Sequence, residues 1–214
     1  RLWSEYYSAH LVLHQIDDVL LALEFADEIR RGAQTAGYEE IDLAAAIQEA
    51  DALVLAGDKS SGQSAEARYQ DAHEALQAVA RLAADLGFTA EQGRALFNDG
   101  LVYEKQGRLE EAVARYDAAL ETVGRADNPD LLNEVRAVAA AAYEARGSTV
   151  GAIGLLDDIA GDLTGDGDAS RELAGNLYDK GRLLNLAYRF PEAAHELTSA
   201  LELQKADEAV SQWG

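Results

Sequence analysis

The sequence predicts an all-α protein built as a stack of about five antiparallel helix hairpins. Only two prolines, Pro129 and Pro191, occur in an alanine-rich chain of 214 residues. Proline disrupts helix interiors, whereas alanine is the best helix former. Small residues and turn glycines also recur about every forty residues. A stack of hairpins requires such a repeat, because each hairpin buries its apolar face only against its neighbours.

The clearest repeat lies between residues 96 and 120, LFNDGLVYEKQGRLEEAVARYDAAL. Its apolar and small residues fall at helical spacing on two segments, and Gly107 between them predicts the turn. Gly100 and Ala112 have almost no side chain, so we expect the two helices to approach closely there. The other residues expected on the two packing faces are Leu96, Tyr103, Tyr116 and Ala119.

Four further segments repeat this pattern, and the expected repeats span residues 3–37, 38–88, 90–128, 130–165 and 169–210 of a single domain. A small residue opens the second helix of each repeat, namely Ala22, Ala72, Ala112, Ala152 and Ala193. In the first repeat, Asp17 replaces the turn glycine and His10 the small residue. Two further features depart from the pattern. Arg136 stands where the third repeat has Leu96, and the polar stretch DKSSGQSAE predicts an expanded turn in the second repeat.

This arrangement of glycine, alanine and tyrosine resembles the tetratricopeptide repeat (TPR) family over nearly the whole chain. The usual period is about 34 residues. A period near forty is similar to the longer repeats of kinesin light chain or of repeat domains in bacterial transcription activators. The resemblance implies a right-handed superhelical stack, a TPR-like α-solenoid, in which the first helices line a concave groove. A generic alanine-rich helical bundle is the alternative interpretation.

Residues of the first helices that lie off the packing face predict the partner-binding surface. Aromatic and arginine side chains are common interface anchors, and an amide can both donate to and accept from a peptide backbone. Asn98 matches a position where the TPR family often holds the ligand backbone. The alternative for each residue is that it is solvated or contacts the next repeat. The candidates are Tyr7, His14, Gln48, Phe97, Asn98, Leu101, Glu104, Lys105, Tyr178, Arg182 and Asn185.

The net charge of −21 restricts the classes of partner. No cluster of lysine and arginine exists to displace counterions from phosphates, which argues against nucleic acids and anionic membranes. No apolar run approaches the roughly 20 residues that span a bilayer, so we expect a soluble, cytoplasmic protein. A basic or apolar polypeptide fits this charge best. The acidity is typical either of a salt-loving source or of a GC-rich bacterium.

Several patterns that resemble chemical sites are incomplete. His10 and His14 share a helix face but lack the intervening glutamate of a zinc-protease motif. The stretch from Asp162 resembles a calcium loop, yet Leu173 occupies the twelfth position, which requires glutamate. Cysteine is absent, and no nucleophile elbow or phosphate-binding glycine loop occurs. We therefore expect no metal, no cofactor and no enzymatic activity.

The predicted function is a protein–protein interaction scaffold that binds a partner polypeptide in the concave groove. Two alternatives stay open at this point. One is a regulatory or sensor repeat domain of a larger protein, and the other is a scaffold that self-assembles through its end repeats.

Overall fold

A computed structural model describes residues 18–164 and 170–211 of the chain. Every regular element within these ranges is an α-helix. In chain order the helices are α2 (Val19–Ala36), α3 (Glu39–Asp58), α4 (Gln63–Leu86), α5 (Thr89–Lys105), α6 (Leu109–Val123), α7 (Pro129–Ala145), α8 (Thr149–Leu163), α9 (Ser170–Leu186) and α10 (Phe190–Ser211). None of these helices is long and apolar enough to cross a membrane.

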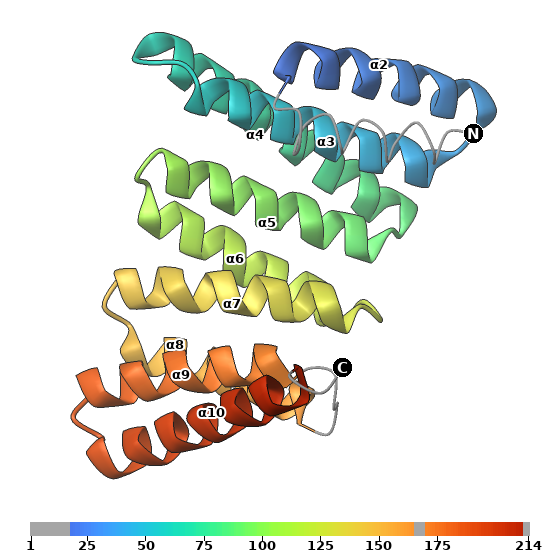
Figure 1. Cartoon of the computed structure of the whole chain (residues 1–214). Coiled ribbons are helices and arrows are strands. Elements are labelled where there is room, and N and C mark those ends of the chain that lie inside the picture. Colours follow the sequence, from blue (N-terminus) through green and yellow to red (C-terminus); the bar gives the residue numbers. More distant parts are fainter. Residues whose placement is uncertain (1–17, 165–169, 212–214) are drawn as a thin grey trace. The chain divides into compact units, whose positions relative to one another are not determined.

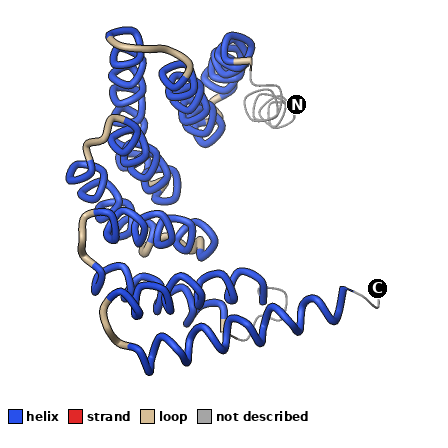
Figure 2. Tube along the Cα trace, turned by 60° about the vertical axis from the view of Figure 1, so that its left-hand side comes forward, coloured by secondary structure: helices blue, strands red, loops and turns tan. Residues whose placement is uncertain are grey.

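The chain divides into two units, residues 1–132 and 133–214. In the first unit, each helix from α2 to α6 packs against the next one in the chain, and α3 also contacts α5 (Figures 1 and 2). In the second unit, α8 packs against α9, and α9 packs against α10 (Figure 1). Antiparallel neighbours therefore follow one another in chain order within each unit.

The helices begin and end close to the expected boundaries of the second and third repeats. Helices α3 and α4 lie within 38–88, whereas α5 begins at Thr89, one residue before its expected repeat. The expanded turn predicted in the second repeat is wrong. Only residues 59–62 separate α3 from α4, and the rest of the polar stretch forms the adjoining helix ends. Polar side chains at helix ends remain solvated, so a helix can continue through them. The repeat boundaries and the single domain stay predictions.

The turns that follow α5, α7 and α9 share one backbone conformation. Gly107 and Gly147 have φ angles of 71° and 85°, in the left-handed region that glycine adopts without strain. After each glycine, the next backbone N–H closes the helix end by donating to a carbonyl five residues earlier, from Arg108 to Tyr103 and from Ser148 to Tyr143. Tyr188 takes the same conformation after α9, with a φ angle of 60°.

Small residues face large ones where paired helices touch. A Cβ atom added at Gly100 would lie 2.5 Å from Cε1 of Tyr116, a fully buried ring on the partner helix. Glycine is therefore needed at this position for the two helices to pack this closely. Gly181 with Leu197 is the equivalent pair in the α9–α10 hairpin, and Gly57 with Tyr69 and Gly151 with Tyr143 are close glycine contacts at other positions. Ala112 is also fully buried, although the nearest neighbour of Gly100 is Tyr116.

A core cluster of the first unit joins three successive helices. Ala95 and Val102 of α5 are completely buried against the α3–α4 hairpin. The buried residues of the hairpin that form this cluster are Leu43, Ala46, Ile47, Ala50, Ala72, Leu76, Val79 and Ala83. The α3–α4 hairpin thus buries one of its faces under α5, the first helix of the next hairpin.

Candidate protein-binding surface

Two polar pairs connect the expected first helices α3 and α5. Nδ2 of Asn98 donates a hydrogen bond to Oδ1 of Asp51 at 2.8 Å. Nζ of Lys105 forms an ion pair with Oδ2 of Asp58, also at 2.8 Å. The two members on each helix are seven residues apart, so both pairs lie on the same helix faces, two turns apart. We call these pairs the two rungs.

The two rungs differ in electrostatic character. Burial raises the pKa of Asp51 to about 7, although the hydrogen bond from Asn98 and the charge of Arg94 partly oppose that shift. This carboxyl therefore exchanges its proton near neutral pH. Burial also acts against ionisation at Asp58, but hydrogen bonds from Lys105 and Tyr69 outweigh it and lower the pKa of Asp58. The second rung is consequently a stable ion pair at neutral pH.

Other candidates on α5 lie beside this surface in different environments. Leu101 is half-buried and lies between the rungs along the helix. Glu104 is exposed and accepts a hydrogen bond of 2.7 Å from the hydroxyl of Tyr116. Phe97 is only 3% exposed and packs on the ring of Tyr116, with the centroids 5.9 Å apart. Phe97 thus belongs to the interior of its own hairpin.

Gln48 of α3, another candidate of the first unit, is also an interior residue. Gln48 is 5% exposed, and its side-chain amide makes no hydrogen bond within the described part of the chain. Tyr7 and His14, which complete the predicted set in this unit, lie outside the described residues.

In the second unit, Arg182 of α9 forms a forked ion pair with Glu144 of α7. Its Nη1 and Nη2 donate to the two carboxylate oxygens at 2.5 and 2.7 Å. This contact lowers the pKa of Glu144, although burial opposes the shift. Asn185 is exposed, and Tyr178 is 57% exposed. Asn98, Lys105 and Arg182 thus contact a neighbouring hairpin, which is the alternative anticipated for such residues.

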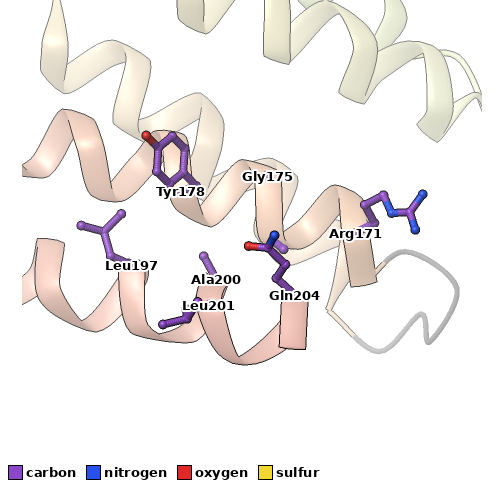
Figure 3. Close-up of a pocket in the computed structure, with 8 residues that line it drawn as sticks. Arg171, Gly175, Tyr178, Leu197, Ala200, Leu201 and Gln204 are labelled. Carbon is purple, nitrogen blue, oxygen red and sulfur yellow. The ribbon is translucent and has the colours of Figure 1, made fainter. Parts of the chain in front are cut away.

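A pocket of about 730 Å³ opens between α9 and α10 (Figure 3). Tyr178 borders it from α9, and Leu197 and Leu201 border it from α10. The other lining residues are Arg171, Ala174, Gly175, Ala200 and Gln204. Its size lies within the range of roughly 300–1,000 Å³ that is usual for ligand sites, and its lining is largely apolar.

A buried ionic network joins α4, α5 and α6, and sequence reasoning did not predict it. His73 and Asp99 are 3% and 1% exposed, and the Nδ1 atom of His73 bonds directly to the Asp99 carboxylate. Nε of Arg115 lies 2.9 Å from the second oxygen of Asp99. A histidine between Ala72 and Leu76 on the packing face of α4 was the available signal.

Both ring nitrogens of His73 face acceptors. Nε2 lies 2.9 Å from Oε1 of Gln106, whose own Nε2 donates to Glu66, which fixes the amide orientation. This arrangement favours an imidazole that carries a hydrogen on each ring nitrogen and is positively charged. Burial acts to lower the pKa of His73, but the hydrogen bonds to Asp99 and Gln106 raise it above its ordinary value.

Neither of the incomplete metal motifs can be placed in full. His10 and His14 lie outside the described residues, as does part of the acidic stretch after Asp162. Across residues 18–164 and 170–211, no three histidine or acidic side chains are grouped closely enough to hold a metal ion.

No protein-family model and no curated protein sequence matches the chain. Solved structures do match it. The repeats of a kinesin light chain from Podosopora anserina, described as nearly identical and TPR-like, are 18% identical to this chain, with a TM-score of 0.70. The match covers 98% of this chain and 97% of the other. The fold is TPR-like.

Two further structures share this TPR-like fold at lower similarity. BtubC (BKLC) from P. vanneervenii is 16% identical, with a TM-score of 0.58, and the match covers 97% of this chain and 92% of the other. The apo form of RapI is 10% identical, also with a TM-score of 0.58, and the match covers 97% of this chain and 84% of the other. The expected all-α stack of repeated hairpins and its TPR-like character are therefore confirmed.

Proposed function

We propose that this chain is a protein-binding scaffold whose α3–α5 strip holds a segment of a partner polypeptide. The strip consists of Arg94, Asn98, Leu101 and Lys105 on α5, together with Asp51 and Asp58 on α3. Its α5 members recur at intervals of three or four residues, so they follow one helix face. We further propose that the chain acts by binding and not by catalysis.

The observation that carries this proposal is the alternation of polar and apolar features along the strip. A hollow of about 170 Å³ lies at one end, lined by Ala44, Ile47, Ala90, Glu91, Arg94, Asn128 and Leu131. The Asn98–Asp51 rung, the half-buried Leu101 and the Lys105–Asp58 rung follow along α5. An extended peptide could place an apolar side chain in the hollow and another against Leu101, while its backbone bonds to rung side chains.

Helix dimensions set the length of the segment that the strip can hold. Arg94 and Lys105 are eleven residues apart, which corresponds to roughly 16 Å at the rise of an α-helix. An extended chain advances about 3.3 Å per residue. The strip therefore matches roughly five residues of a partner, a typical length for a short recognition segment.

The charge of the chain favours a basic or apolar partner. The net charge of −21 attracts cationic segments at long range. A lysine or arginine placed beside Asp51 would stabilise the ionised carboxylate and thereby offset the effect of burial on its pKa. A partner carboxylate at the same place would be repelled by both strip aspartates.

Affinity capture with matched variants tests this proposal. Proteins captured from a cell lysate by the unmodified chain would be identified by mass spectrometry and then compared with those captured by Leu101→Asp. The control is Leu82→Asp, which changes a leucine of α4 that is 44% exposed and lies outside the strip. We expect Leu101→Asp to lose the specific partner and Leu82→Asp to retain it. Equal capture by all three proteins would contradict the proposal.

A further inference from the structure

The pocket between α9 and α10 is open, whereas the corresponding surface of the α3–α4 hairpin is covered by another helix. Tyr178 and Leu201, which border the pocket, are 57% and 48% exposed. Figure 3 shows Tyr178 on one helix and Leu197 and Leu201 on the facing one. Apolar side chains as exposed as these are characteristic of binding surfaces when they gather in a hollow.

The repeat register identifies the equivalent positions in the α3–α4 hairpin. Ala72 and Ala193 open the second helices of the two hairpins, so Leu76 and Val79 correspond to Leu197 and Ala200. On the first helices, Ala50 and Gly181 correspond, which pairs Ile47 with Tyr178. Ile47, Leu76 and Val79 are all at most 5% exposed and belong to one core cluster.

An α-helix closes this surface on the α3–α4 hairpin. Helix α5 contributes Ala95 and Val102 to the same cluster, and both are completely buried. Ala95 and Val102 are seven residues apart and therefore lie on the same face of α5. One small and one branched aliphatic side chain thus complete the core of the α3–α4 hairpin. Helix α5 is therefore an example, within this chain, of a helix that fits the surface equivalent to the α9–α10 pocket.

We propose that the α9–α10 pocket is the docking site for an amphipathic helix of a partner polypeptide. The helix lies on α9 and α10 as α5 lies on α3 and α4, and it presents a seam of small and aliphatic residues to Tyr178, Leu197 and Leu201. A second copy of the chain is a poorer occupant, because two molecules of charge −21 repel each other. This surface is separate from the α3–α5 strip.

A peptide with the sequence of residues 88–106 provides a probe, because it contains the seam of α5. Its fluorescein-labelled form would be titrated with the full chain and followed by fluorescence anisotropy. We expect saturable binding that weakens at least about tenfold in Leu201→Asp and in Tyr178→Asp, since each change places a charge against the apolar seam. Both side chains are about half exposed, so the helical content of these variants should be retained.

The control variant is Val150→Asp, which changes an 80% exposed residue of α8 that does not line the pocket. It should bind the peptide as tightly as the unmodified chain does, and so should Leu101→Asp on the α3–α5 strip. Absence of binding, or equal affinity in Leu201→Asp and Val150→Asp, would overturn the proposal. Sedimentation equilibrium that reveals a dimer dissociated by Leu201→Asp would assign the pocket to a second copy and would also overturn it. Neither result would bear on the strip, which Leu101→Asp tests separately.

Discussion

At the scale of single residues, Tyr188 occupies a backbone conformation that suits glycine. Its φ angle is 60°, whereas the turns after α5 and α7 carry Gly107 and Gly147 in the same conformation. A left-handed conformation costs an L residue roughly 1–2 kcal/mol, because the Cβ atom crowds the following carbonyl oxygen. The side chain recovers little of this cost, since Tyr188 is 81% exposed and makes an edge contact with Phe190.

Replacing Tyr188 with glycine should therefore stabilise the protein. Relief of the backbone strain outweighs the greater flexibility of glycine in the unfolded chain, and we expect a gain of about 0.5–1 kcal/mol in the free energy of unfolding. Urea denaturation followed by circular dichroism measures this change. The opposite substitution, Gly147→Ala, should lose about 1 kcal/mol. A lower unfolding free energy in Tyr188→Gly would show that the strain is negligible.

The buried His73 should make stability depend on pH. The pKa of His73 in the folded protein is raised above the ordinary value of 6.5. The contribution of His73 to the free energy of unfolding is therefore complete below about pH 6.5. It is lost as the pH rises through the pKa of His73 in the folded protein. The groups that face it directly or through Gln106 and Tyr103 are Glu66, Asp99, Tyr103, Arg108 and Arg115.

The measurement compares the unfolding free energy of the unmodified chain with that of His73→Gln between pH 5.5 and 9. Glutamine cannot provide two charged donors, so the advantage of the unmodified chain should be about 2 kcal/mol in acid and should shrink as the pH rises. A difference that stays constant or grows with pH would mean that His73 is neutral in the folded protein.

At the scale of helices, close packing depends on particular glycines. Gly100 faces the buried ring of Tyr116, whose hydroxyl is held by Glu104. The ring cannot move aside without losing this hydrogen bond. Gly154 of α8 has open space around it and requires no such fit. These two glycines therefore allow the effect of packing to be separated from the intrinsic helix preference.

The two alanine substitutions should have opposite signs. Gly100→Ala should destabilise the chain by about 1–3 kcal/mol, because the added methyl group overlaps Tyr116. Gly154→Ala should stabilise it by about 0.5–1 kcal/mol, because alanine favours an open helix position. Thermal and urea denaturation of both variants would provide the comparison. Equal effects in the two variants would show that Gly100 is not needed for packing.

The sequence allowed most of the helix arrangement to be predicted. Gly107 and Gly147 mark turns by their conformational freedom, and the alanine that opens each second helix marks where helices touch. The turn between α3 and α4 was misjudged, because a polar stretch is typical of loops but also suits exposed helix ends. Tyr188 could not be recognised as a turn residue, because tyrosine seldom adopts the left-handed conformation.

At the scale of the whole molecule, the surroundings of the candidate binding residues were harder to predict than the fold. Helical spacing placed Phe97 and Asn98 together as candidates, yet one is buried against Tyr116 and the other bonds to Asp51. Neighbouring positions differ by about 100° around a helix, which is enough to separate interior from surface. The rungs also join residues 47 positions apart, and only the packing of α3 on α5 brings them together.

The acidity of the chain acts on the molecule as a whole. Thirty-nine acidic residues against 18 basic ones give long-range attraction to cationic partners, while the local ion pairs neutralise individual carboxylates. The same charge opposes association between copies. In the proposed function, the total charge would select the class of partner, and the strip would provide the short-range contacts.

Hydrogen–deuterium exchange of the chain with and without its captured partner tests the central claim most directly. If the α3–α5 strip holds the partner, amides of residues 39–58 and 89–105 should gain protection on binding, while the exposed side of α4 should change little. Protection confined to α4 and α6, with none in α3 and α5, would contradict the assignment of the binding surface.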